Sequence, residues 1–141
     1  MAGYLLDTNV VSETRKARAD PHVLSFLGTA HAAALFLSAL TLGELRKGVA
    51  AQRRIDPAAA DRLGNWVDDI EITYADRVLP VEISVARIWG ELSARRSLPV
   101  IDTLIAATAL VYGLTLVTRN IRDVEFTGVP VIDPWTQGTQ A

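Results

Sequence analysis

Residues 98–120 read Leu98-Pro-Val-Ile-Asp102-Thr-Leu-Ile-Ala-Ala-Thr-Ala-Leu-Val-Tyr-Gly113-Leu-Thr-Leu-Val-Thr118-Arg-Asn120. Between residues 103 and 111 the side chains are apolar or small in almost every direction, which predicts a helix buried on all sides. Gly113 is placed to end this helix, and residues 114–117 predict a short buried strand. Polar groups frame this buried unit, because Asp102 begins the helix and residues 118–120 follow the strand.

The composition limits the kind of protein this can be. A chain of 141 residues is long enough for one domain, which we expect over residues 1–136, with a disordered tail over residues 137–141. Half of the residues are hydrophobic, which suggests a surface covered by a second copy or a partner. The chain has no cysteine, so disulfides, zinc–thiolate sites and thiol nucleophiles are excluded, and a cytoplasmic location is expected.

Two further bulk properties narrow the class of partner. No apolar run is long enough to span a bilayer, and the N-terminus does not resemble a signal peptide, so we expect no membrane association. The net charge is -2, so the chain has no global positive field. Any attraction to a nucleic acid must therefore come from local basic patches.

Strands and helices are expected to alternate along the chain. Apolar runs predict strands at residues 3–7, 33–38, 77–81, 114–117 and 129–132, and Pro80 places the third near a sheet edge. Helices are predicted over residues 8–13, from Asp20-Pro21, from Thr41, from Asp56-Pro57 to about residue 74, over residues 83–94 and over residues 103–111. The third of these begins with Thr41-Leu-Gly-Glu44, which fits a capping box. This alternation predicts an α/β domain whose short parallel sheet is covered on both faces.

Acidic side chains fall where such a fold gathers its functional groups. The carboxyl ends of parallel strands and the amino ends of the following helices lie on one edge of the sheet, where ligands bind. Five residues map to that edge although they are far apart in the chain: Asp7, Glu44, Asp102, Asn120 and Asp123.

Each of these residues also has a structural interpretation. Asp7 could cap the next helix, Glu44 could be only the acid of the capping box, and Asp102 could only complement the helix dipole. Asn120 and Asp123 could be turn formers. The group is more informative than its members, because carboxylates that converge repel one another unless a cation is present. Oxygen ligands without histidine or cysteine favour Mg²⁺ or Mn²⁺ over zinc, and such a site suits phosphoryl chemistry.

Four segments together resemble the successive motifs of PIN domains, and most closely those of VapC-type toxins of type II toxin–antitoxin modules. The segments are Leu5-Leu-Asp7-Thr-Asn9-Val-Val-Ser12-Glu13, Leu40-Thr-Leu-Gly-Glu44-Leu, Ile101-Asp102-Thr-Leu-Ile-Ala-Ala-Thr-Ala and Leu116-Val-Thr118-Arg-Asn120-Ile-Arg-Asp123. The resemblance covers nearly the whole chain. It implies a three-layer α/β/α fold and a magnesium-dependent endoribonuclease, with Mn²⁺ as a substitute. It also implies a homodimer held silent by a cognate VapB-like antitoxin.

The resemblance also assigns roles to residues. It makes Asp7 and Asp102 the principal metal ligands and Glu44 the third acid, which binds the metal directly or through water. The fourth acidic position of the family is Asn120 here, and Asp123 is the nearby acid that could replace it. We therefore expect one metal ion more readily than two. Thr8, Asn9 and Thr118 are expected to support the acids.

Basic and aromatic residues have less specific interpretations. Arg46, Lys47, Arg119 and Arg122 could hold RNA phosphates beside the acidic edge, or could be solvated surface charges. The basic run at residues 15–18 has the same two interpretations. Both histidines are far from any acidic motif, so neither is expected to act as a general base. The three tryptophans favour core or interface packing over base stacking.

Two alternative functions remain at this stage. A phospho-acceptor receiver domain also gathers acids and Mg²⁺ at a sheet edge, but it needs a lysine at the end of a late strand, and no lysine follows Lys47. A PIN nuclease acting in RNA maturation or on single-stranded DNA would keep the same chemistry and differ in its substrate.

Overall fold

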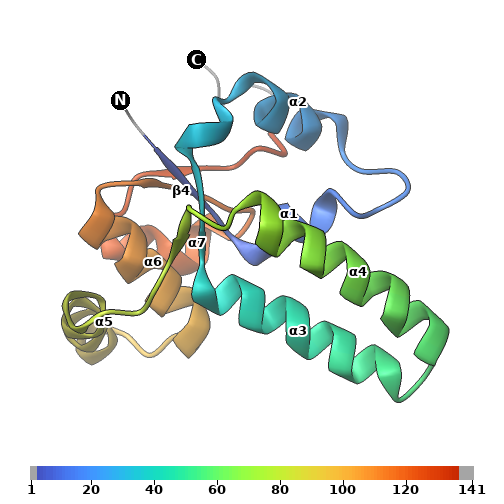
Figure 1. Ribbon diagram of the computed structural model, residues 1–141. Coiled ribbons are helices and arrows are strands. Elements are labelled where there is room, and N and C mark those ends of the chain that lie inside the picture. Colours follow the sequence, from blue (N-terminus) through green and yellow to red (C-terminus); the bar gives the residue numbers. More distant parts are fainter. Residues whose placement is uncertain (1–2, 137–141) are drawn as a thin grey trace.

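Five short parallel strands lie at the centre of the computed structural model, which describes residues 3–136 (Figure 1). They are β1 (Tyr4–Leu6), β2 (Leu35–Ser38), β3 (Val78–Leu79), β4 (Thr115–Val117) and β5 (Val131–Ile132). Their order across the sheet is β3-β2-β1-β4-β5, and every neighbouring pair is parallel. The predicted parallel sheet is confirmed, and β3 lies at an edge as Pro80 indicates. The expected tail over residues 137–141 lies outside the described residues.

Helices cover both faces of this sheet. They are α1 (Thr8–Glu13), α2 (Pro21–Thr29), α3 (Ala39–Arg53), α4 (Pro57–Thr73), α5 (Ile83–Arg95), α6 (Val100–Tyr112) and α7 (Ile121–Val124). Figure 1 shows α3 and α4 side by side as a long hairpin on one side of the sheet, with α5 and α6 together on the other. The predicted three-layer α/β/α architecture is confirmed. No helix within residues 3–136 combines the length and the apolar character that crossing a bilayer requires.

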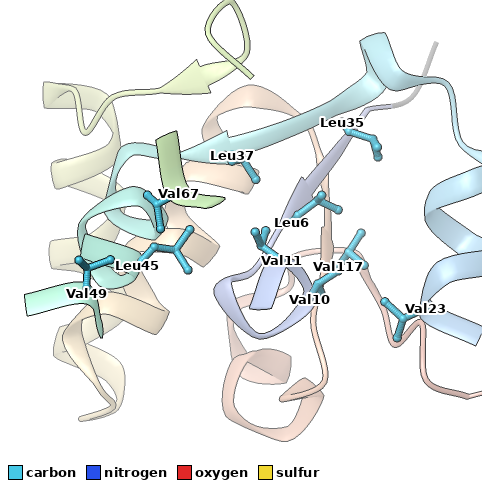
Figure 2. Close-up of a cluster of buried hydrophobic side chains, with 10 residues drawn as sticks. All are labelled: Leu6, Val10, Val11, Val23, Leu35, Leu37, Leu45, Val49, Val67 and Val117. Carbon is cyan, nitrogen blue, oxygen red and sulfur yellow. The ribbon is translucent and has the colours of Figure 1, made fainter. Parts of the chain in front are cut away.

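Adjacent residues of the central strand β1 point into different halves of the core. Leu6 packs with residues from α1, α2, β2, α3, α4 and β4, in the cluster drawn in Figure 2. Its neighbour Leu5 packs with Ile105, Ala106 and Ala109 of α6 and with Leu116 of β4. This alternation follows from the pleat of a strand, which turns successive side chains to opposite faces. A strand with both faces covered must be apolar throughout, as this one is.

The helix ends mostly follow the sequence signals. Asp20 and Asp56 are N-caps whose carboxylates accept backbone N–H groups, and a proline follows each of them. Gly113 ends α6 in the left-handed conformation, with φ at 67°. A side chain at this position would be strained, which is why glycine is favoured there. Helix α6 begins at Val100, so Asp102 lies in its first turn.

The start of α3 differs from the prediction. The helix begins at Ala39, and its N-cap is Ser38, whose Oγ accepts the backbone N–H of Leu40 at 3.0 Å. Thr41 is therefore already inside the helix, so the predicted capping box between Thr41 and Glu44 is wrong. The reason is that β2 runs into α3 without a loop, so its last residue caps the helix. This releases the side chains of Thr41 and Glu44 for contacts with other elements.

Candidate active site

Asp7 is the most constrained acid at the carboxyl edge of the sheet. It directly follows β1, and its side chain is almost fully buried, with 7% exposed. Its Oδ1 accepts the backbone N–H of Thr8 at 2.7 Å, so Asp7 also caps α1. Its Oδ2 accepts the hydroxyl of Thr118 at 2.7 Å and the amide of Asn9 at 3.4 Å. The cap and the functional interpretation of Asp7 are therefore compatible, because one oxygen serves the helix while the other faces the end of β4.

Thr118 connects the ends of β1 and β4. Besides donating to Asp7, its Oγ1 accepts the side-chain amide of Asn9 at 3.3 Å and the backbone N–H of Asn120 at 3.0 Å. Its backbone N–H donates to Ile132 of β5 at 3.0 Å, and its side chain is buried. Asp7, Asn9 and Thr118 thus form one hydrogen-bonded unit, drawn from segments more than 100 residues apart.

Thr8 joins this unit to Glu44. Its hydroxyl donates to Oε1 of Glu44 at 2.5 Å and lies 3.2 Å from the hydroxyl of Thr41. Thr41 is fully buried, so it fixes the position of Thr8 between α1 and α3. Glu44 is therefore oriented by a side-chain contact across two helices, and not by the capping box that the sequence suggested. Its second oxygen, Oε2, receives no donor from residues 3–136.

Asp102 lies close enough to the other acids to be affected by their charges. Burial is the main reason that the pKa of Asp102 is raised, and the charges of Asp7, Glu44 and Asp123 raise it further. The pKa of Asp7 is also raised by burial and by the charge of Glu44, although its hydrogen bonds from Thr118 and Thr8 act in the opposite direction. The structure therefore gathers the predicted acids into one electrostatic group.

Asp123 and Asn120, the two candidates for the fourth acidic position, differ in whether they place a charge near Asp102. The charge of Asp123 acts on Asp102, and Asp123 is half-buried. The exposed Asn120 is neutral, and its backbone N–H donates to Thr118. An open cavity of about 490 Å³ is lined by residues of this segment, namely Arg119, Asn120, Ile121, Arg122, Asp123 and Glu125. Asp123 is therefore the acid that α7 contributes to the edge.

The acids do not form a complete metal cage in this arrangement. Within residues 3–136 no three histidine, cysteine, aspartate or glutamate side chains are placed so that they could hold a metal ion together. The chemistry of the donors nevertheless fits a hard cation, since Mg²⁺ keeps several of its waters and is commonly bound by only one or two carboxylates together with substrate phosphates. A cation at this edge would also offset the repulsion that raises the pKa of Asp102.

The four basic residues proposed from the sequence have different surroundings. Arg46 donates to Asp68 and Glu71 of α4, at 2.6 and 2.5 Å, so its charge is already compensated. These ion pairs connect α3 to α4. Because they already occupy its guanidinium, Arg46 is a less suitable RNA contact than a free arginine. Arg119 and Arg122 are exposed and line the cavity next to Asp123. Lys47 is exposed on α3 and has no ion pair within residues 3–136.

Two residues of this region were not anticipated in these roles. Thr41 was interpreted as a helix cap but is a buried partner of Thr8. The sequence favours core or interface packing for Trp135, and its ring also contacts the guanidinium of Arg119, whose Cζ lies 4.8 Å from the ring centre. Neither contact has a local sequence signal, because both depend on the packing of distant segments. From local sequence alone, Thr41 has the spacing of a capping residue, so its contact with Thr8 could not be predicted.

Comparisons with known proteins agree with the fold of this chain. The family model described as the PIN domain matches residues 4–127. The chain is 37% identical to the VapC ribonuclease Y4jK of Sinorhizobium fredii, over 93% of this chain and 96% of that protein. It is 33% identical to the plasmid stability protein StbB of Pseudomonas syringae, over 93% and 97%. The crystal structure of FitAcB from Neisseria gonorrhoeae superimposes with a TM-score of 0.87 and 31% identity, over 95% of this chain and 99% of that one.

Proposed function

The chain belongs to the PIN-domain family, with VapC ribonucleases among its relatives, and on this basis we propose that it is a magnesium-dependent endoribonuclease toxin. The reaction would be hydrolysis of an RNA phosphodiester bond in the cytoplasm. The observation that carries the proposal is the placement of Asp102 at one sheet edge, close enough to Asp7, Glu44 and Asp123 for their charges to act on it. A positively charged ligand at this edge would offset the repulsion between these carboxylates.

In this proposal Asp7 and Asp102 hold the ion, and Glu44 holds it directly or through a water molecule. When bound, Mg²⁺ would stabilise negative charge on the phosphate and make water a better nucleophile at neutral pH. The Oε2 atom of Glu44 is the oxygen available for this, because Oε1 is occupied by Thr8. Mn²⁺, which also prefers oxygen ligands, is expected to replace Mg²⁺.

The supporting residues set the orientation of the acids. Thr118 and the backbone of Thr8 each donate a hydrogen bond to Asp7, which partly offsets the rise in its pKa caused by burial. The hydroxyl of Thr8 fixes Glu44. Neither histidine belongs to this hydrogen-bonded network, so a carboxylate oxygen is the side-chain proton acceptor that we propose. Arg119, Arg122 and Lys47 are the exposed cations proposed to hold RNA phosphates beside the acids.

We also propose a cognate antitoxin as partner and a homodimer as the assembly. Similar structures include FitAB bound to a DNA fragment and, at 26% identity and a TM-score of 0.74, DNA-bound VapBC from Salmonella typhimurium. The apolar composition of this chain, half of whose residues are hydrophobic, supports a covering partner.

The function is tested by incubating the purified chain with total tRNA, ribosomal RNA and single-stranded DNA, with Mg²⁺ or with EDTA. We expect new RNA ends with Mg²⁺ or Mn²⁺, none with EDTA, and intact DNA. Cleavage of DNA alone would favour the alternative nuclease. Intact RNA in every metal-containing sample would contradict the proposal. Addition of a small protein encoded next to this chain should suppress cleavage if that protein is the antitoxin.

Asp123 is expected to complete the acidic site in place of Asn120. Asp123→Asn should lower the rate of RNA cleavage by about 10-fold, or about 1.4 kcal/mol of barrier, because it removes a charge that acts on Asp102. Asn120→Ala should change the rate by less than about threefold, because Asn120 contributes a backbone N–H, which alanine keeps. Single-turnover rates at saturating Mg²⁺ measure both effects. Equal losses in the two variants would contradict this assignment.

A further inference from the structure

The stacked pair of Arg119 and Trp135 lies next to the acidic site and has no role in the chemistry described so far. The Cζ atom of Arg119 lies 4.8 Å from the centre of the Trp135 ring. The two residues follow neighbouring strands, since Arg119 comes shortly after β4 and Trp135 shortly after β5. The hydrogen bond from Thr118 to Ile132 extends the pairing of these strands towards the stack.

The hydrophobic core and the turn after β5 hold Trp135 in place. It packs against the core cluster that includes Leu6 and Val10, and it is half-buried. Its backbone N–H donates to Oδ1 of Asp133 at 2.8 Å, which holds the turn after β5. The ring is therefore a rigid surface on which a guanidinium can lie. Such stacking is favourable by about 0.5–1 kcal/mol at exposed sites.

The guanidinium of Arg119 keeps its hydrogen-bonding capacity. The contact with the ring is a cation–π interaction, and the guanidinium carries five N–H donors in a rigid fork. No acceptor for these donors and no ion pair of Arg119 occurs within residues 3–136, and the side chain is exposed. Arg46 and Arg77 differ in this respect, because carboxylate or carbonyl oxygens already occupy their donors. Arg119 is thus an uncompensated cation that is nevertheless held in one place.

The backbone of Arg119 lies close to the acids. Its N–H donates to Oδ1 of Asn9 at 3.4 Å, and the amide of Asn9 donates to Asp7. Only two hydrogen bonds therefore separate the base of the Arg119 side chain from the buried carboxylate of Asp7. The guanidinium of Arg119 contacts Trp135 and forms no ion pair with an acid within residues 3–136.

We propose that Trp135 is a positioning residue, which holds the guanidinium of Arg119 so that its free edge binds a phosphate of the RNA next to the one that is cleaved. This inference rests on the proposed ribonuclease function. A planar guanidinium binds phosphate through two parallel hydrogen bonds. Prior stacking reduces the conformational freedom that the side chain loses on binding, so affinity is gained without a direct contact between Trp135 and RNA.

Affinity and catalysis are measured separately to test this. The dissociation constant of a labelled mixed-sequence RNA of about 20 nucleotides is measured by anisotropy in the non-cleaving Asp102→Asn protein, between 50 and 200 mM KCl. Arg119→Ala should weaken binding about 10-fold and lower the slope of log affinity against log salt by about 0.7. Trp135→Leu should weaken binding about threefold to fivefold, and Trp135→Phe, which keeps an aromatic face, less than about twofold.

The double variant separates positioning from a merely structural role. If Trp135 acts through Arg119, Trp135→Leu should have no further effect on affinity in the Arg119→Ala protein. In the protein with Asp102 intact, the effect of Trp135→Leu should appear in KM for RNA and not in kcat at saturating RNA. Arg54→Ala is the matched control, because Arg54 is exposed and caps the C-terminus of α3, ten residues after Glu44 and about 15 Å along the helix axis.

Several results would overturn the inference. Additive losses in the double variant, or an unchanged salt slope in Arg119→Ala, would mean that Trp135 does not position a phosphate-binding arginine. Should Trp135→Leu fail to fold by circular dichroism, Arg119→Lys provides the second test, since it keeps the charge but loses the stack and should weaken binding about threefold. Wild-type-like binding by Arg119→Lys would then contradict the proposal. Failure of the unsubstituted chain to cleave any RNA would instead refute the proposed function, and that result is obtained before any variant at 119 or 135 is made.

Discussion

Replacement of Asp102 by asparagine is expected to lower RNA cleavage by at least about 10³-fold, or about 4 kcal/mol of barrier, while the protein stays folded. Asp102 lies in the first turn of α6, a helix that is buried along most of its length, so its position is set by the core. Asparagine has nearly the same shape but no negative charge, and it cannot hold a divalent ion as a carboxylate does. The variant therefore changes the chemistry at the edge and leaves the packing as it is.

The folded state of this variant should be at least as stable as the unsubstituted chain when no divalent ion is present. The pKa of Asp102 is raised by burial and by three neighbouring carboxylates, so the ionised form is disfavoured in the fold. A neutral side chain removes that cost. Asp69→Asn is the control, because Asp69 is an exposed acid on α4 with no ion pair within the described part of the chain. Cleavage that persists in folded Asp102→Asn would show that the acidic edge is not the active site.

Much of the fold could be predicted because its signals are local. The buried helix α6 and the left-handed Gly113 are recognisable in residues 98–120 alone, and the Asp-Pro starts mark α2 and α4. The position of the acids could also be predicted, since the topology of a parallel sheet brings strand ends to one edge whatever their separation in the chain. Topology places Asp7 and Asp102 in the same region without any knowledge of their side-chain contacts.

The errors arose where a local motif competes with a distant partner. Thr41 and Glu44 have the spacing of a capping box, but Ser38 caps the helix and the two side chains turn to Thr8. Arg46 lies one turn from the acidic edge and suggests a phosphate contact, yet α4 supplies Asp68 and Glu71 to neutralise it. Spacing within one helix cannot reveal what a second helix presents to it. The same limitation applies to Trp135, whose contact with Arg119 depends on strand pairing.

Removal of divalent ions is expected to abolish cleavage and to lower the thermal midpoint of unfolding. An ion present at about ten times its dissociation constant adds about 1.4 kcal/mol to the free energy of unfolding. For a domain of this size that corresponds to about 5 °C. The physical reason is that the ion relieves the repulsion of Asp102 with Asp7, Glu44 and Asp123. Thermal unfolding in Mg²⁺ and in EDTA, followed by circular dichroism, measures the shift, and a parallel RNA assay measures cleavage.

Two comparisons distinguish a bound ion from general screening of charge. KCl at matched ionic strength screens surface charges but cannot occupy the site, so it should reproduce little of the Mg²⁺ effect. Asp102→Asn should lose most of the Mg²⁺-dependent shift, and in EDTA it should unfold at a higher temperature than the unsubstituted chain. An equal shift in both proteins would place the stabilising ion elsewhere. Cleavage that survives chelation would mean that the carboxylates at this edge act on RNA without a metal, and it would contradict the proposed role of the ion.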